Sequence, residues 1–299
     1  MTTTTTPQTS PVPAAAGDER PVRAASTLIL LRDAQQGPQV LMLKRHGQSD
    51  VLGGAFVFPG GKLDAQDAQL DEARHLDERA AALHERLGEP DIDAATAMAL
   101  YVAALRETFE ECGLLLAEGL EQAHAEQARA RLLQGLAFHV LLDELGLRLR
   151  VGALAPWSRW VTPPHSPNKR FDTRFFVARA PEGLARHDER ETTEARWVQP
   201  RAALQSYWQG ELTLAPPQIM TLAHLARHAS VDSALDEARG RRPALILPHV
   251  LGQGDGRTMC YPGDDLHPVR ERAMPGPLRL FSRNRRYEPE GGFEGFFAA

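Results

Sequence analysis

The stretch of sequence that decides the fold is residues 106–114, which read Arg106-Glu107-Thr108-Phe109-Glu110-Glu111-Cys112-Gly113-Leu114. On a helix the three glutamates stand at positions i, i+3 and i+4, and therefore share one face. Like charges at these spacings repel each other by roughly a few tenths of a kcal/mol per pair at an exposed site. A surface that needed only solubility has no reason to concentrate them, although an acidic helix face by itself is usually just solvated.

A divalent cation would give this acidic face a purpose. Mg²⁺ and Mn²⁺ prefer carboxylate oxygens and commonly bridge to substrate phosphates. Such an ion neutralises phosphate charge, positions a water molecule and lowers the pKa of that water. A carboxylate that is not fully committed to the metal can orient or deprotonate the same water.

A second segment supplies the context for the glutamates. Residues 53–58 predict a strand, which ends in Phe58-Pro59-Gly60-Gly61-Lys62-Leu63-Asp64. Glycine allows close backbone approach, so amides or carbonyls of this turn can reach a metal ion or a phosphate. A plain tight turn would explain the same residues if nothing else matched.

Together the two segments resemble the Nudix box, G-x5-E-x7-R-E-U-x-E-E-x-G-U, where U is a bulky apolar residue. Gly61 matches the first glycine, and the second half is matched by Arg106, Glu107, Glu110, Glu111, Gly113 and Leu114. Asp67 stands where the pattern has Glu, and Thr108 occupies a U position. Residues 68–105, which are 38 in number, separate Asp67 from Arg106 where the pattern has seven.

A box interrupted in this way is similar to that of the Nudix branch that contains the peroxisomal-type coenzyme A diphosphatases. The similarity covers roughly residues 22–266, including segments 55–61, 105–116, 160–163, 170–176, 214–218 and 261–264. It implies an α/β Nudix fold, in which a mixed β-sheet is sandwiched between helices. It also implies a helical insertion inside the box, over residues 68–98, and a C-terminal extension.

The resemblance assigns roles to the residues of the box. Glu107, Glu110 and Glu111 would be catalytic and would hold Mg²⁺ or Mn²⁺, with the Gly60 carbonyl as an additional ligand. Arg106 is also a candidate catalytic residue, although the resemblance favours a structural role in which it pairs with an acidic residue near the turn. Asp67 is its nominal partner, and the sequence leaves open whether this shorter side chain, beside an insertion, reaches Arg106.

Further residues are candidates for binding the substrate. Coenzyme A-cleaving members carry an upstream signature, L-L-T-x-R-[SA]-x3-R-x3-G-x3-F-P-G-G, which Arg45 fits, whereas Asp50 replaces the second arginine. The substrate-binding candidates are Arg45, Gly61, Lys62, Arg170 and Asp172. An additional acid could come from Glu191 or Glu194, each of which can equally be a loop acid that precedes a strand.

Hydrophobic periodicity and turn residues predict the remaining elements. Strands are expected at 24–31, 40–43, 147–154, 157–161, 173–178, 195–198 and 244–251. Helices are expected at 68–87, from 92 to Gly113, and at 121–133, 138–145, 217–228 and 231–239. The predicted organisation is a disordered tail over 1–20, a Nudix hydrolase domain over 21–215, and a helical and hairpin extension over 216–299 that packs on it.

Composition limits the function classes. The chain has 299 residues and a net charge of −5, which argues against broad nucleic-acid binding. Its apolar stretches are too short to span a bilayer, so no membrane partner is expected. Cys112 and Cys260 have no metal-type spacing, and a reducing cytoplasm is the simpler inference.

The expected activity is attack of water on a diphosphate in a small nucleotide-containing molecule. Resemblance favours coenzyme A or an acyl-coenzyme A, which would give a phosphopantetheine product and adenosine 3′,5′-bisphosphate. Other Nudix substrates remain open, namely ADP-ribose, dinucleotides or nucleoside triphosphates, as does a non-catalytic nucleotide-sensing module. The oligomeric state is also open, with a homodimer as one option.

Overall fold

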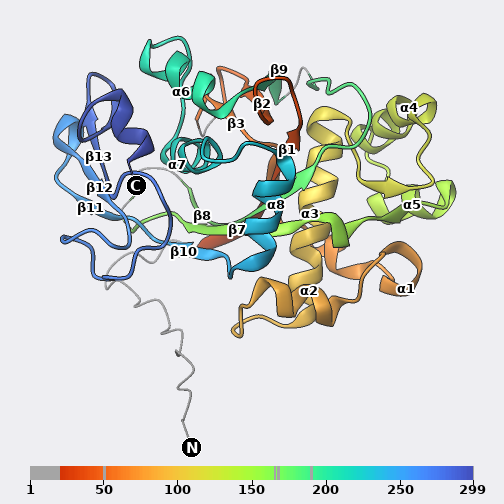
Figure 1. Ribbon diagram of the computed structural model, residues 1–299. Coiled ribbons are helices and arrows are strands. Elements are labelled where there is room, and N and C mark those ends of the chain that lie inside the picture. Colours follow the sequence, from red (N-terminus) through yellow and green to blue (C-terminus); the bar gives the residue numbers. More distant parts are fainter. Residues whose placement is uncertain (1–20, 50–51, 165, 167–168, 189–190, 299) are drawn as a thin grey trace, which may run out of the picture.

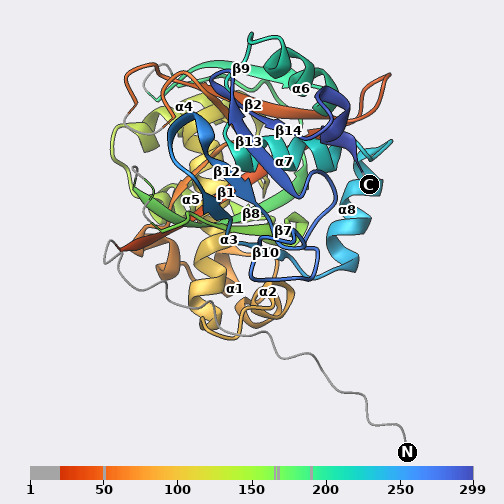
Figure 2. The same ribbon diagram turned by 90° about the vertical axis from the view of Figure 1, so that its left-hand side faces the viewer.

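The computed structural model describes residues 21–49, 52–164, 166, 169–188 and 191–298. A mixed eight-stranded sheet carries helices on both faces (Figure 1), and a smaller four-stranded sheet lies in front of it in the turned view (Figure 2). This arrangement confirms the predicted α/β class with a mixed sheet between helices. The tail predicted over residues 1–20 lies outside the described residues.

The main sheet follows the order β10-β7-β8-β1-β2-β3, with β4 paired to β1 and β9 paired to β2. Its strands are β1 Val22–Arg32, β2 Gln39–Arg45, β3 Phe56–Val57, β4 Gly60–Lys62, β7 Ala155–Val161, β8 Arg170–Arg179, β9 Thr192–Val198 and β10 Ala244–Ile246. β1 runs parallel to β8, whereas β4 and β2 run antiparallel to β1. β1 is therefore an inner strand of the sheet and lies directly beside the glycine turn of β4.

Both faces of β1 are buried, which explains its nearly continuous apolar sequence. Leu28 and Leu30 pack into one core together with α3, while Ile29 and Leu31 pack into a second core on the opposite face. Because side chains alternate along a strand, the sheet separates two hydrophobic cores.

The helices are divided between these two cores. The first core includes α2 Ala80–Leu87, α3 Ala94–Cys112, α4 Gln122–Leu133 and α5 Phe138–Leu145, together with the short pair β5 Ala117–Glu118 and β6 Arg148–Leu149. The short helix α1 Glu72–His75 contacts β6 at the edge of this core. The second core includes α6 Pro200–Trp208, α7 Pro216–Leu225 and α8 Val231–Gly240. In Figure 1, α4 and α5 lie to the right of α3, and α6 and α7 lie to its left.

The second sheet comes entirely from the C-terminal part of the chain. Its order is β11-β12-β13-β14, and its strands are β11 His249–Leu251, β12 Thr258–Cys260, β13 Arg279–Arg283 and β14 Arg286–Pro289. Short 3-10 turns at Ala65–Gln69, Val151–Ala153, Gly254–Gly256 and Phe293–Phe297 complete the described elements.

Several sequence predictions of single elements are wrong. The helix predicted over 68–87 is a 3-10 turn followed by α1 and α2, because Asp71 accepts the backbone N–H groups of Ala73 and Arg74 and starts a new helix there. The strand predicted over 244–251 divides at Pro248 into β10 and β11, which belong to different sheets. The helix α6 was not predicted.

In the part of the chain that the structure describes, no helix is both long and apolar enough to cross a membrane. Cys112 and Cys260 are both buried and are not bonded to each other. The Cys112 Sγ donates to the Thr108 carbonyl at 3.1 Å, and burial raises the pKa of this thiol to about 12. A thiol in this state is a poor nucleophile.

The insertion is fixed to the sheet by a buried ionic cluster. Glu89, which follows α2, accepts from Arg174 Nε at 3.0 Å and Nη2 at 2.5 Å, and lies 2.9 Å from Arg159 Nη1. Both arginines also bind Asp172. The side chains of Glu89 and Arg174 are only 9% and 5% exposed, so removal of either partner leaves an uncompensated buried charge.

We therefore expect Glu89→Ala to lower the free energy of unfolding by about 3 kcal/mol, since breaking a buried ion pair from one side is strongly destabilising. Denaturant unfolding measures this change. Glu85→Ala is the matched control, because Glu85 is exposed in the neighbouring helix α2. Equal stability of the two variants would contradict the structural role of the Glu89 cluster.

Candidate active site

The three glutamates lie in the last two turns of α3. Asp93 caps the start of this helix by accepting the Thr96 N–H at 2.7 Å, and Gly113 closes it in a left-handed conformation with φ 76°. The end of the helix at Gly113 agrees with the sequence prediction. Thr108, at the apolar position of the box, is fully buried and satisfies its hydroxyl by donating to the Ala104 carbonyl at 2.7 Å.

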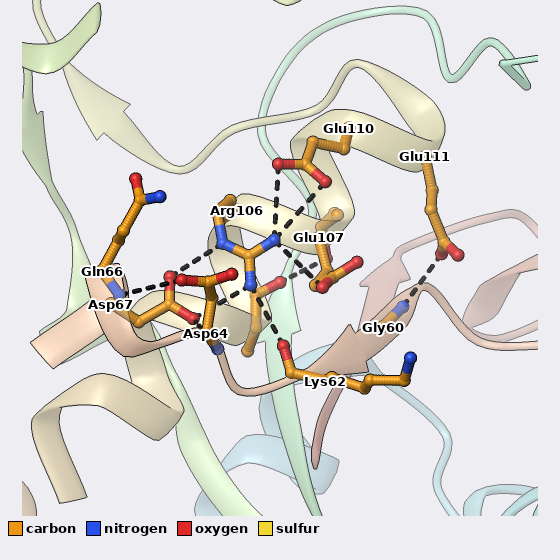
Figure 3. Close-up of polar contacts among 11 residues, drawn as sticks. Gly60, Lys62, Asp64, Gln66, Asp67, Arg106, Glu107, Glu110 and Glu111 are labelled. Carbon is orange, nitrogen blue, oxygen red and sulfur yellow. Dashed lines mark hydrogen bonds and ion pairs between the residues drawn. The ribbon is translucent and has the colours of Figure 1, made fainter. Parts of the chain in front are cut away.

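Arg106 and Asp67 form a bidentate ion pair that closes the insertion. Arg106 donates from Nε to Asp67 Oδ1 at 2.7 Å and from Nη2 to Asp67 Oδ2 at 2.9 Å (Figure 3). Asp67 reaches Arg106 because it sits in a 3-10 turn capped by Asp64, whose own N–H binds Asp67 Oδ2 at 2.8 Å. The shorter acid therefore does pair with the arginine, which answers the question that the sequence left open.

The remaining nitrogens of Arg106 organise the glutamates and the turn. Nη1 donates to Glu107 at 3.0 Å and to Glu110 at 3.3 Å, and Nη2 donates to the Lys62 carbonyl at 3.1 Å. Burial acts to lower the pKa of Arg106, but the hydrogen bonds to Asp67 and the neighbouring carboxylates raise it above its ordinary value. The guanidinium is thus a permanent cation that holds the turn against α3.

The glycine turn presents its backbone to the glutamates. Pro59 and Leu63 form backbone hydrogen bonds with β1. Because the backbone groups alternate in direction along a strand, those of Gly60 and Lys62 point away from β1 and toward α3. Accordingly, the Gly60 N–H donates to Glu111 Oε2 at 3.0 Å, as Figure 3 shows. In a β-strand the N–H and C=O of one residue point the same way, so the Gly60 carbonyl also faces this side.

Neither glycine of the turn can carry a side chain without disturbing the site. Gly60 has a φ of 154°, and a Cβ there would lie 2.3 Å from the Ser26 carbonyl oxygen. A Cβ on Gly61 would lie 2.4 Å from the Glu107 carboxylate. Residues that are 46 positions apart in sequence are therefore in direct contact, with Glu107 packed on the Gly61 backbone.

The glutamates are held in an environment that disfavours their charged forms. Burial raises the pKa of Glu107 to about 7, and Arg106 only partly offsets this shift. Burial also raises the pKa of Glu110, and it raises that of Glu111 well above its ordinary value, against the lowering effect of the Gly60 hydrogen bond. Buried carboxylates gathered on one side are typical of a site that binds a cation.

The carboxylates do not converge on one point in this structure. Arg106 attracts Glu107 and Glu110, while Glu111 turns toward Gly60 (Figure 3). The donor set nevertheless fits Mg²⁺ or Mn²⁺, because it consists of hard carboxylate oxygens beside a backbone carbonyl.

A cavity of about 1690 Å³ opens beside the glutamates and the glycine turn. Among the predicted residues, it is lined by Gly60, Gly61, Lys62, Arg45, Glu107 and Glu191. The Nε of Arg45 is buried and has no hydrogen-bond partner in the described part of the chain. Glu191 also raises the pKa of Glu110 and Glu111, which places its charge near theirs.

The other predicted residues lie elsewhere. Along β8 the cavity is lined by Phe171 and Thr173, so the alternating residues Arg170 and Asp172 face the opposite side of the sheet. Asp172 belongs to the buried ionic cluster described above. Glu194 pairs with Arg196 on the surface, with Oε1 2.9 Å from the arginine Nε.

One residue that supports the site has no recognisable sequence signal. Arg129, in α4, donates to the backbone carbonyls of Glu110 at 3.0 Å and Glu111 at 2.8 Å. These carbonyls belong to the last turn of α3, where a cation is favourable. Nothing in the spacing between residues 111 and 129 predicts that α4 folds back onto this helix end.

A different cluster competes as a metal site. Among the described residues, His224, His228 and Glu237 bring their ligand atoms within 4.8 Å of one another. However, Arg241 Nε already donates to Glu237 Oε1 at 2.9 Å, and His224 Nε2 lies 2.7 Å from the same oxygen. Since a fixed guanidinium would repel a metal ion there, we interpret this cluster as a structural link between α7 and α8.

Comparisons with known proteins agree with this geometry. The NUDT19 Nudix domain family matches residues 11–225. A Nudix hydrolase structure from Alicyclobacillus acidocaldarius is 30% identical, with a TM-score of 0.61, and the match covers 75% of this chain and 98% of that one. These matches define a Nudix hydrolase fold.

Two curated relatives are more specific. A human protein named acyl-coenzyme A diphosphatase NUDT19 is 28% identical over 274 residues, covering 78% of this chain and 73% of the relative. A Caenorhabditis elegans protein named putative nudix hydrolase 7 is 26% identical over 267 residues, covering 88% and 80% of the two chains. The chain belongs to the NUDT19 family of Nudix hydrolases.

The contact between Gly61 and Glu107 gives a direct test of the site. Gly61→Ala should displace the Glu107 carboxylate, because the added Cβ would lie 2.4 Å from it. We expect loss of hydrolase activity by roughly 10²-fold, with an unchanged circular dichroism spectrum. Gly240→Ala is the control, since nothing lies within 4 Å of a Cβ at that position. Full activity of the Gly61 variant would refute the placement of Glu107.

The raised pKa of Glu107 makes metal binding depend on pH. With a pKa of about 7 in place of 4.5, this carboxyl holds a proton that a cation must displace at lower pH. The affinity for Mn²⁺ should therefore rise about tenfold between pH 6 and pH 8, as isothermal titration would show. A pH-independent affinity would contradict the participation of Glu107.

The same shift has a consequence for stability. Folding raises the pKa of Glu107 from 4.5 to about 7, so the folded protein binds this proton more tightly than the unfolded chain does. The stabilisation of the metal-free protein by this proton is complete below about pH 4.5 and is lost as the pH rises through about 7. Saturating Mn²⁺ should remove this loss in thermal melts.

Proposed function

We propose that this Nudix hydrolase cleaves the diphosphate of coenzyme A or an acyl-coenzyme A. The products would be adenosine 3′,5′-bisphosphate and a phosphopantetheine compound. The observation that carries the proposal is that the buried glutamates adjoin a large cavity with a basic lining. The relatives named acyl-coenzyme A diphosphatase support the choice of substrate.

The dimensions and lining of the cavity favour a long substrate. A volume of about 1690 Å³ exceeds the roughly 300–1,000 Å³ of ordinary small-molecule pockets. Apolar side chains line much of it, among them Phe58, Trp160, Phe171, Leu212, Val250 and Met259. Such a surface suits a nucleobase and an extended thiol or acyl arm, whereas a nucleoside triphosphate would fill only part of it.

The catalytic end would combine the residues of the box. Glu107, Glu110, Glu111 and the Gly60 carbonyl would hold a divalent ion, as Nudix hydrolases generally do. When bound, that ion supplies charge neutralisation at the diphosphate and lowers the pKa of a nearby water. Arg106 would act as a positioning residue, because its contacts are to Asp67, the glutamates and the turn.

Residues of this chain would also orient the reactants. Glu107 lines the cavity and would orient the attacking water. The buried Nε of Arg45 would donate to a diphosphate oxygen, which would provide its missing hydrogen-bond partner. Attack of water at one phosphorus would break the bridging P–O bond, and the bridging oxygen would leave with the other phosphate.

The assay is incubation with Mg²⁺ or Mn²⁺ and a panel of coenzyme A, acetyl-coenzyme A, ADP-ribose, dinucleotides and nucleoside triphosphates, followed by mass spectrometry of the products. We expect cleavage of the coenzyme A compounds to adenosine 3′,5′-bisphosphate. Cleavage of ADP-ribose with coenzyme A untouched would overturn the substrate but keep the chemistry. Tight binding of one compound without turnover of any would instead indicate a sensor.

Variants separate chemistry from folding. Glu110→Gln and Glu111→Gln should each lower kcat by roughly 10²-fold or more, since each removes a charged ligand. Glu118→Gln is the matched control, because Glu118 is exposed in β5 outside the cavity. Near-normal turnover of both site variants would exclude the glutamate site as the catalytic centre.

A further inference from the structure

The four-stranded C-terminal sheet forms a wall of the cavity. Residues 252–257 lead into β12, and residues 284–285 join β13 to β14; both loops contribute to the lining. The Ser282 N–H donates to the Arg257 carbonyl at 2.8 Å, and Thr258 pairs with Phe281 across the strands. The two loops therefore lie at the same end of this sheet, which the turned view shows in front of the main sheet (Figure 2).

Each loop brings one arginine to the cavity. Arg257 is half-buried and Arg285 is exposed, and both belong to the cavity lining. The adjacent Arg286 is already engaged, since its Nε donates to Glu288 at 2.7 Å and its guanidinium lies 4.2 Å from the centre of the Trp208 ring. No described side chain forms an ion pair with Arg257 or Arg285.

The charge of the lining is unlike that of the whole protein. The chain has a net charge of −5, yet the described lining carries six basic residues, namely Arg45, Lys62, Lys169, Arg257, Arg285 and Arg286. Its two acidic residues, Glu107 and Glu191, both belong to the catalytic end. Away from the catalytic end the described lining therefore carries an excess of positive charge, which attracts anions.

The backbone at Arg285 supports the same conclusion. The hairpin between β13 and β14 has a two-residue loop in which Asn284 and Arg285 both have positive φ values, of 50° and 61°. Such a turn favours Asn followed by Gly, and a long side chain at the second position is disfavoured. An arginine kept in a strained conformation at the edge of a cavity is typical of a binding residue.

We propose that Arg257 and Arg285 form a second anion site, which binds a phosphomonoester of the substrate away from the cleaved diphosphate. This inference rests on the proposed function, in which the substrate carries a 3′-phosphate on its ribose. Two guanidinium groups match the charge and the oxygen geometry of a phosphomonoester dianion. The C-terminal sheet would thereby select substrates that carry a third phosphate.

Kinetics with two substrates test the proposal. Arg257→Gln and Arg285→Asn, alone and combined, should lower kcat/KM for coenzyme A about tenfold through KM, while leaving kcat/KM for 3′-dephospho-coenzyme A unchanged. Asparagine is chosen at position 285 because it tolerates a positive φ. Arg283→Gln is the control, since Arg283 lies on the same hairpin outside the lining. An equal loss for both substrates would overturn the proposal.

Binding measurements keep this test independent of turnover. In isothermal titration, the wild-type protein should bind adenosine 3′,5′-bisphosphate about tenfold more tightly than AMP, and the double variant should bind the two equally. If the wild type shows this preference but cleaves no coenzyme A, the proposed function fails and the anion site stands. If the wild type binds both nucleotides equally, or the double variant keeps the preference, the anion site is refuted.

Discussion

The bidentate ion pair between Arg106 and Asp67 is the constraint on which the rest of the site depends. It joins the two ends of the 38-residue segment 68–105, where the box pattern has seven residues, so that two distant sequence segments are adjacent in space. Burying a charged pair is costly unless its hydrogen bonds are satisfied. Here the guanidinium also binds two glutamates and the Lys62 carbonyl, while Asp67 accepts a backbone N–H as well. The insertion can therefore be long without loosening the site.

The ion pair between Arg106 and Asp67 also affects the charge balance around the glutamates. Arg106 supplies one positive charge to a group of three carboxylates, and burial still raises the pKa of each of them. The metal-free site is thus short of positive charge, a deficit that a divalent cation would remove. The glycine turn contributes by allowing the Glu107 carboxylate to pack against the backbone at Gly61.

The parts of the molecule that follow from local rules were predictable from sequence. The end of α3 at Gly113 and the turn at Gly60 each depend on neighbouring residues. Alternation along β8 likewise makes Arg170 and Asp172 share one face, but the sequence cannot say which face meets the cavity. The structure places both on the face opposite the cavity.

Contacts between distant segments were not predictable. Whether Asp67 reaches Arg106 depends on a 3-10 turn stabilised by its own capping hydrogen bonds, and the sequence indicated a longer helix nearby. Arg129 reaches the end of α3 only because α4 folds back against it. The C-terminal strands form a wall of the cavity through pairings between β12, β13 and β14, which no periodicity of the chain reveals.

The most direct measurement is a crystal structure with Mn²⁺, in which anomalous scattering locates the ion. A peak beside the carboxylates of Glu107, Glu110 and Glu111 and the Gly60 carbonyl is the expected result. An absence of density there at saturating Mn²⁺, or a peak only at His224, His228 and Glu237, would contradict the assignment of the interrupted box as the metal site.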